Sequence, residues 1–175
     1  MQIEVESGEA TFRFLLFCLI ESPLMEIQTA SLRDLGALRR LEQVCFGKDA
    51  WPLLDLIAVL TWQGVIRLKA VEAGEMIGFV VGDPRRSEGV AWISTIGVDP
   101  RCQRRGIGRA LLHACEAQIK LPRIKLTVRK SNQAAISLYE KEGYRTLDIW
   151  RGYYNDSEDG LVMGKNLAGD LIRAI

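Results

Sequence analysis

The chain has 175 residues, of which 48% are hydrophobic, and its formal net charge is +1. This length and composition suit one compact domain, with a tail at most. The balanced charge provides no global field that would attract nucleic acid or a membrane surface, so neither is expected as a partner and any anion site must be local.

The first 24 residues contain a short apolar run over residues 14–20. It is far shorter than the ~20 residues that span a bilayer, and the stretch before it carries glutamates where a signal peptide carries positive charge. A strand-like stretch begins at Met25. We therefore expect residues 1–24 to be an N-terminal extension, residues 25–167 the domain and residues 168–175 a tail. Whether the extension belongs to the fold stays open.

Two helices are predicted after this first strand. Residues 31–46 carry apolar residues at helical spacing, and Ser31 with Asp34 resembles a capping box. Residues 51–62 place Pro52 at a first helical position. Their apolar side chains lie nearly all around the helix, which predicts that it is buried.

The rest of the chain alternates strand and helix patterns. Residues 76–82 form a continuous apolar run, typical of a central strand, and residues 82–89 are predicted to be a polar connection. Helices are predicted at residues 106–120 and at 131–143, the second started by Ser131 or Asn132. Further strands are predicted over residues 65–71, 90–98, 123–129, 144–154 and 161–167. This order predicts a single α/β domain, with a mixed central sheet flanked by helices on both faces.

The four cysteines, at positions 18, 45, 102 and 115, include no CxxC pair, and His113 is the single histidine. This spacing does not build a zinc site, and no metal is expected. Free thiols in a reducing compartment are the simplest interpretation, which predicts a cytoplasmic protein.

Residues 99–112 read DPRCQRRGIGRALL. A helix start exposes unpartnered N–H groups and partial positive charge, and glycines let the backbone approach a ligand. Together with the arginines, this turn predicts a phosphate site. The alternative is a tight turn with solvated arginines. A dinucleotide fold is disfavoured because Leu111 stands where that motif needs its third glycine.

The segment VDPRCQRRGIGRA resembles the acyl-CoA motif, Q/R-x-x-G-x-G/A, of the GNAT family of N-acetyltransferases. VRKSNQAAISLYEKEGY resembles a second segment of that family, and RGYYNDSEDGLVM resembles the tyrosine-rich end of its ribosomal-protein-alanine branch. The resemblance covers residues 25–167 and implies a GNAT-like domain that uses acetyl-CoA as co-substrate. It places the cofactor against Ile96, Gly97, Val98, Arg104, Arg105, Gly106, Ile107, Gly108, Arg109 and Asn132.

The implied chemistry is attack of an amine on a thioester, which needs a neutral amine, a polarised carbonyl and a proton for the departing thiolate. The resemblance implies that the strand before the turn parts from its neighbour, and that a backbone N–H near Val98 donates to the oxyanion. Tyr139 matches the family's general acid. The alternative for Tyr139 is a core tyrosine that shares a helix face with Ala135 and Leu138.

The acceptor side is less fully matched. Tyr153 and Tyr154 match the substrate-side tyrosines of the branch, or else are ordinary strand residues. The acidic loop that follows, residues 155–160, either attracts a cationic amine or is merely solvated. Thr127 and Trp92 stand where the family places its catalytic glutamate. Deprotonation then goes through ordered water or through another residue such as Glu42, or the substrate needs little help or differs from that of the branch.

The sequence thus predicts an acetyl-CoA-dependent N-acetyltransferase that acts on a primary amine, the N-terminal α-amine of a protein or peptide. A small-molecule amine acetyltransferase and a non-catalytic acyl-CoA-binding regulatory module are the alternatives. A monomer and a homodimer, and the length of the acyl chain, stay open.

Overall fold

The computed structural model describes residues 25–167; the expected extension and tail lie outside this range. The strands are β1 (Glu26–Thr29), β2 (Ile66–Glu72), β3 (Glu75–Arg85), β4 (Val90–Val98), β5 (Arg123–Arg129), β6 (Arg145–Trp150) and β7 (Gly160–Asn166). The α-helices are α2 (Leu35–Phe46), α3 (Leu53–Thr61), α4 (Ile107–Gln118) and α5 (Gln133–Lys141). Short 3-10 turns cover Leu32–Asp34, Gly47–Asp49, Arg86–Glu88 and Pro100–Cys102. The predicted order of strands and helices is confirmed.

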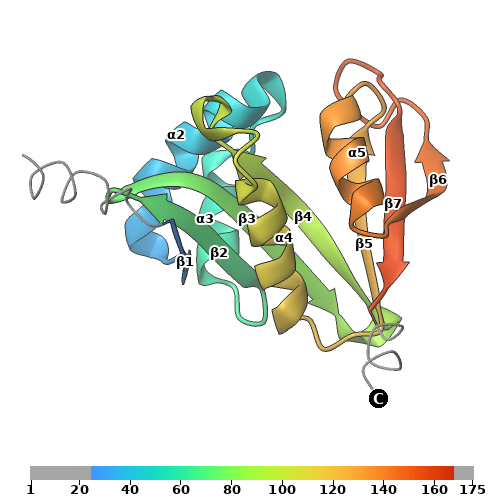
Figure 1. Ribbon diagram of the computed structural model, residues 1–175, viewed down its shortest axis with the longest axis horizontal. Helices are drawn as coiled ribbons and strands as arrows, with labels where there is room; N and C mark the ends of the chain where they lie inside the picture. Colours follow the sequence, from blue (N-terminus) through green and yellow to red (C-terminus); the bar gives the residue numbers. More distant parts are fainter. Residues whose placement is uncertain (1–24, 168–175) are drawn as a thin grey trace, which may run out of the picture.

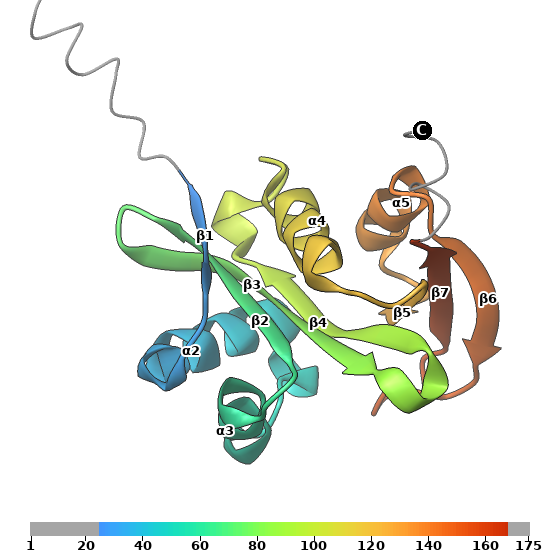
Figure 2. The same ribbon diagram turned by 90° about the horizontal axis from the view of Figure 1, so that it is seen from below.

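The strands form one seven-stranded sheet in the order β1-β2-β3-β4-β5-β7-β6. Only β4 and β5 pair in parallel, and every other neighbouring pair is antiparallel. Helices α2 and α3 cover one face, while α4 and α5 lie on the other (Figures 1 and 2). The predicted single α/β domain with a mixed sheet between helices is therefore confirmed.

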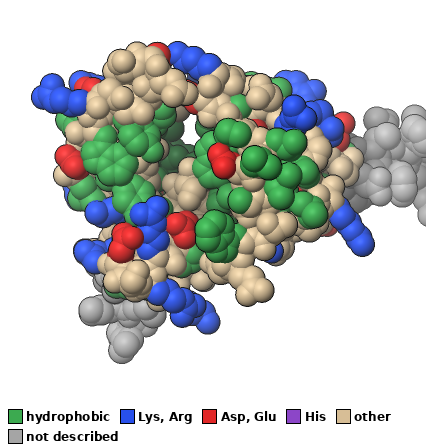
Figure 3. Space-filling model, turned by 180° about the vertical axis from the view of Figure 1, so that it is seen from behind, with side chains coloured by type: hydrophobic (Ala, Val, Ile, Leu, Met, Phe, Trp, Pro, Cys, Tyr) green, Lys and Arg blue, Asp and Glu red, His purple; other side chains and the backbone are tan. Residues whose placement is uncertain are grey.

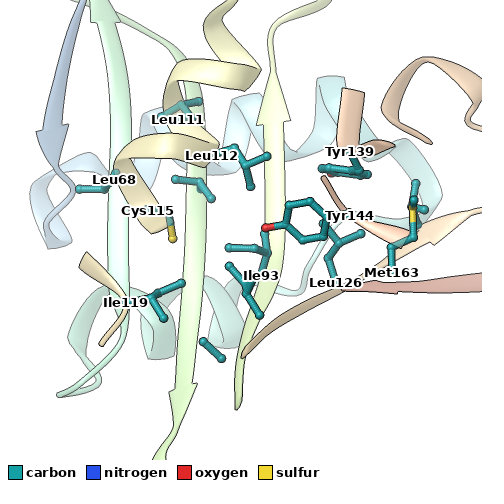
Figure 4. Packing of buried hydrophobic residues seen from close by; sticks show 14 of the residues in the cluster. Leu68, Ile93, Leu111, Leu112, Cys115, Ile119, Leu126, Tyr139, Tyr144 and Met163 are labelled. Carbon is teal, nitrogen blue, oxygen red and sulfur yellow. The ribbon is translucent and has the colours of Figure 1, made fainter. Parts of the chain in front are cut away.

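The larger part of the core lies between α4, α5 and the sheet. Leu111 and Leu112 of α4 are fully buried against the strands, and Tyr144 lies deep beside them (Figure 4). The Tyr144 hydroxyl donates a hydrogen bond of 2.7 Å to Glu116. A second cluster lies between α2, α3 and the opposite face, around Phe79. Burying apolar surface on both faces stabilises the sheet as the scaffold of the site.

Three predictions about local structure before β4 are wrong. Helix α3 is not buried all around, because Leu54 is 76% exposed while only one face, with Leu56 and Leu60, reaches the core. Pro52 is the N-cap of this helix and not its first residue. Strand β3 continues to Arg85, through residues expected to be a connection, because they pair with the start of β4.

Strand β4 carries one extra residue at Ser94. On β3, Val81 pairs with Thr95 and the next residue, Gly82, pairs with Ile93, so Ser94 has no partner of its own. Such a bulge bends a strand and increases its twist. The pairing of β4 with β5 ends at Ile93, one residue before the bulge. Beyond it the two strands diverge, as the resemblance implies and as Figure 1 shows.

Candidate active site

A cavity of about 560 Å³ lies where β4 and β5 separate. Its walls come from α2, the turn after α2, the two diverging strands, α5 and the loop that follows β6. In the space-filling view this face is hollowed, and an opening separates two groups of hydrophobic side chains (Figure 3). Of the residues predicted from the sequence, the cavity brings together Ile96, Thr127, Asn132, Tyr139, Tyr153 and Tyr154.

The other predicted residues lie beyond the cavity, along the end of β4 and the start of α4. Gly106 has φ +82° and caps α4, and Arg104 also has positive φ, +61°. The first intrahelical bond runs from the N–H of Ala110 to the carbonyl of Gly106, so the N–H groups of the three residues between them are those that a helix start leaves for a ligand. This geometry can hold an anion.

Gly108 links this turn to the opening between the strands. A Cβ atom built on Gly108 would lie 3.6 Å from Leu138 of α5 and 3.7 Å from Val98 of β4. The start of α4 therefore lies next to both β4 and α5, two elements that also contribute Ile96 and Tyr139 to the cavity wall.

Two arginines of the turn form ion pairs with carboxylates. Arg105 donates to Glu72 at 2.5 and 2.9 Å, and these bonds lower the pKa of Glu72. Arg109 donates to Glu142 at 2.5 Å, and His113 and Arg109 together lower the pKa of Glu142. All three basic side chains are about half exposed, so a bound phosphate can compete for the guanidinium groups.

Tyr139 is both a core residue and a cavity residue. It is only 5% exposed, and its ring lies 5.7 Å from that of Tyr144. Burial raises its pKa above the usual value for a phenol, with a smaller contribution from Tyr154. Asn132, at the start of α5, accepts a hydrogen bond from the N–H of Ala135 at 3.1 Å. Its side-chain oxygen thus caps the helix, which leaves the amide nitrogen for a ligand.

Tyr153 and Tyr154 lie in the loop after β6, not in the predicted strand, which ends at Trp150. An aromatic row runs from Trp92 through Trp150 and Tyr153 to Tyr154, with successive ring centroids 5.7, 5.2 and 5.1 Å apart. Burial raises the pKa of Tyr154 to about 12. The row forms an apolar wall with a polar end, which suits an extended peptide.

The acidic loop is tied to the sheet and is not merely solvated. Arg129 of β5 donates to Asp49, Asp156 and Glu158 at distances of 2.5 to 3.2 Å. These partners raise the pKa of Arg129 and so keep it charged at all ordinary pH values. Arg129, whose side chain is 19% exposed, therefore holds the loop that carries the two tyrosines in place.

Thr127 and Trp92, which occupy the positions where the resemblance implies a glutamate, both line the cavity. Neither residue carries a carboxylate. A Cβ atom on Gly160 would approach Thr127 to 2.8 Å and Tyr153 to 3.2 Å. Gly160 is required here because a threonine and a tyrosine pack over the same backbone.

The carboxylate that does line the cavity belongs to Glu42 of α2, which is 1% exposed. One of its oxygens accepts a hydrogen bond from the N–H of Trp51 at 3.1 Å. Burial raises its pKa to about 7. The sequence offered a signal for this position, because Glu42 falls on the apolar stripe of its helix with Leu38 and Cys45.

Cys45, Cys102 and Cys115 are free thiols, while Cys18 lies outside the described residues. Burial raises the pKa of Cys45 to about 12, so this thiol stays protonated beneath the end of β4. Within residues 25–167, no helix is both long and apolar enough to cross a bilayer.

Residues 35–144 match the model of the acetyltransferase (GNAT) family. The catalytic subunit NAA10 of the N-terminal acetyltransferase A complex of Arabidopsis thaliana is 28% identical over 150 residues, which are 82% of this chain and 78% of that protein. The [Ribosomal protein bS18]-alanine N-acetyltransferase of Escherichia coli strain K12 is 35% identical over 104 residues, 56% of this chain and 69% of that protein.

Solved structures agree with the sequence relatives. The crystal structure of the ribosomal-protein-S18-alanine N-acetyltransferase from Escherichia coli superposes with a TM-score of 0.75 at 29% identity, covering 82% of this chain and 94% of that one. Ard1 from Thermoplasma volcanium gives a TM-score of 0.74 at 26% identity, covering 81% and 97%. The chain belongs to the GNAT family of acetyltransferases. It is an N-acetyltransferase, and its expected likeness to the ribosomal-protein-alanine branch is confirmed.

Proposed function

We propose that the protein transfers the acetyl group of acetyl-CoA to the N-terminal α-amine of a protein or peptide. The observation that carries the choice of acceptor is a set of three unpartnered polar atoms. Among the described residues, only Glu42 Oε2, Asp49 Oδ1 and Trp92 Nε1 are buried side-chain polar atoms without a hydrogen-bond partner, and all three residues line the cavity.

Buried polar atoms in folded proteins are nearly always paired, so such a set points to a missing ligand. Two of these atoms accept hydrogen bonds and one donates. An N-terminal residue offers the complement, since its amine carries two or three hydrogens and its first peptide carbonyl accepts. The aromatic row from Trp92 to Tyr154 would then flank the following residues of the chain.

Acetyl-CoA fits the other side of the gap. The start of α4, with Gly106, Gly108 and the arginines around them, is suited to a pyrophosphate. The separated edges of β4 and β5 leave backbone groups of the segment Ile96, Gly97 and Val98 for an extended arm, although the Val98 carbonyl accepts a hydrogen bond of 3.2 Å from the Gln103 side chain. Asn132 lines the same cavity as Ile96. The thioester would reach the cavity beside Tyr139, whose phenol is the candidate donor to the departing thiolate. The family's named N-terminal acetyltransferases support this assignment, and the free cysteines suit a cytoplasmic enzyme.

The test is acetylation by the purified protein of three acceptors at equal concentration. These are a peptide with a free N-terminus, the same peptide with a blocked N-terminus and one free lysine, and a polyamine. We expect the first to be acetylated with the highest kcat/KM. Preference for the lysine peptide or for the polyamine would contradict the proposed acceptor.

A further inference from the structure

Glu42 is the one cavity carboxylate whose charge is not balanced by a cation. Glu42 is 1% exposed, its Oε1 accepts a hydrogen bond from the Trp51 N–H, and its Oε2 has no partner among the described residues. Asp49 lines the same cavity, but its Oδ2 accepts two hydrogen bonds from Arg129. An ion-paired carboxylate is a weaker base than one held in an apolar site.

We propose that Glu42 is the general base of this enzyme and takes the role that Thr127 and Trp92 cannot fill. The proposal rests on the proposed function, because it places the acceptor amine in the cavity. It identifies the proton acceptor within the chain: a carboxylate supplied by the helix that packs beneath the end of β4, in place of one supplied by a strand.

The proton balance is complete with groups of this chain. The amine enters as an ammonium ion and gives one proton to Oε2 of Glu42. The neutral nitrogen attacks the thioester carbon, the C–N bond forms and the C–S bond breaks. Tyr139 gives its proton to the sulfur and recovers one from the nitrogen, which becomes the amide. Glu42 then releases its proton to solvent, so each turnover yields one amide, one thiol and one proton.

The groups around Glu42 decide how it titrates. Its own helix contributes Cys45, whose thiol is protonated. The rest of the cavity wall contributes Asp49 with Arg129, Arg85, and the phenols of Tyr139, Tyr153 and Tyr154. Arg129 forms ion pairs with three carboxylates, and the phenols of Tyr139 and Tyr154, whose pKa values are raised, are neutral near pH 7. Glu42 is thus the group of this set that changes charge near neutrality.

The decisive variant is Glu42→Gln, which keeps the shape of the side chain and the acceptor for the Trp51 N–H. Its matched control is Glu116→Gln, the same chemical change at a carboxylate that binds Tyr144 and Lys165 outside the cavity. The readout is the pH dependence of kcat/KM with two N-terminal peptides, one of which carries a fluorinated first residue to lower the pKa of its amine.

For the wild type and for Glu116→Gln, we expect kcat/KM to rise with a midpoint near 7 with both peptides. For Glu42→Gln, we expect about a 10²-fold loss at pH 6.5, a much smaller loss at pH 9, and a midpoint that follows the pKa of each amine. Binding of acetyl-CoA, measured by calorimetry, should stay within a factor of two in all variants.

The proposal is overturned if Glu42→Gln keeps the midpoint near 7 in the pH dependence of kcat/KM. It is also overturned if that midpoint disappears in Asp49→Asn but not in Glu42→Gln. If another amine proves to be the better acceptor, the proposed function fails, yet the same profiles measured with that amine still decide the role of Glu42. If the wild type acetylates none of the amines, both proposals are overturned.

Discussion

The guanidinium of Arg129 lies 4.1 Å from the centre of the Tyr154 ring and is bonded at the same time to Asp49 in the turn after α2. One side chain of β5 thus joins two walls of the cavity. Because Arg129 also binds Asp156 and Glu158, the loop that carries Tyr154 cannot move without breaking charge-assisted bonds.

Replacing Arg129 by Gln should therefore loosen the acceptor site. Asp49, whose side chain is 19% exposed, would lose its cation, which should cost about 1–3 kcal/mol of the free energy of unfolding. We expect KM for the peptide to rise about 10-fold or more, since about 1.4 kcal/mol of lost binding suffices, with a smaller change in kcat. The matched control is Lys48→Gln, which removes only an exposed partner of Asp156. Equal KM values for both variants would argue against this role.

Gly108→Glu should abolish binding of acetyl-CoA. A side chain at position 108 has room between Leu138 and Val98, so the protein should fold, but the new carboxylate would stand against the bound pyrophosphate. Gly36→Glu, which adds the same charge on the exposed side of α2, should bind normally. Calorimetric titration with acetyl-CoA checks this, and comparable binding by the two variants would place the phosphate site elsewhere.

Tyr139→Phe keeps the ring in the core and removes the hydroxyl. We expect kcat to fall about 10²-fold or more, with little change in the binding of acetyl-CoA. Tyr144→Phe is the control, because it breaks the hydrogen bond to Glu116 in the core and should cost about 1 kcal/mol of stability without an effect on turnover. Single-turnover measurements separate chemistry from product release, and an unchanged chemical step would leave Tyr139 a core residue only.

The titration of Glu42 also predicts how stability depends on pH. Burial raises its pKa from 4.5 to about 7 in the folded protein, so between these values the folded state binds more protons than the unfolded state. The wild type should then lose stability as the pH rises from about 4.5 through 7, by up to about 3 kcal/mol. Glu42→Gln should lack this slope. Urea unfolding at pH 5 and pH 8 measures this change in the free energy of unfolding. An equal change in both proteins would show that the pKa of Glu42 is not raised in the folded state.

Much of the fold could be predicted because local patterns and tertiary contacts agree. The glycine and arginines before α4 mark its start, and Asn132 caps α5 as its residue type suggests. The prediction that α3 is buried on all sides failed because the hydrophobicity of Leu54 does not indicate whether another element packs against it. The predicted strand to Tyr154 was too long because β7 offers pairing partners only as far as Trp150.

The site was harder to predict, since its geometry depends on the register between distant strands. Nothing in the composition of β4 marks Ser94 as an extra residue, because a bulge is defined by the pairing of two strands. The burial of Glu42 likewise depends on how α2 packs on the sheet. The motifs located the residues that we propose to contact acetyl-CoA, whereas the cavity's buried polar atoms that lack a partner among the described residues follow only from tertiary packing.

Next to the bulge at Ser94, β4 and β5 each have an unpaired edge inside the sheet, in addition to the edges of the two outermost strands. Past the Ile93–Leu126 pair, β4 and β5 face each other with open hydrogen-bonding groups, much as a strand at the rim of any sheet does. Such margins invite β-type association, but here α5 and α2 flank the slot, so a folded neighbour cannot enter it. An extended, chain-like molecule is narrow enough to form hydrogen bonds with these strand edges. The extra residue Ser94 thus exposes strand edges that select for extended ligands.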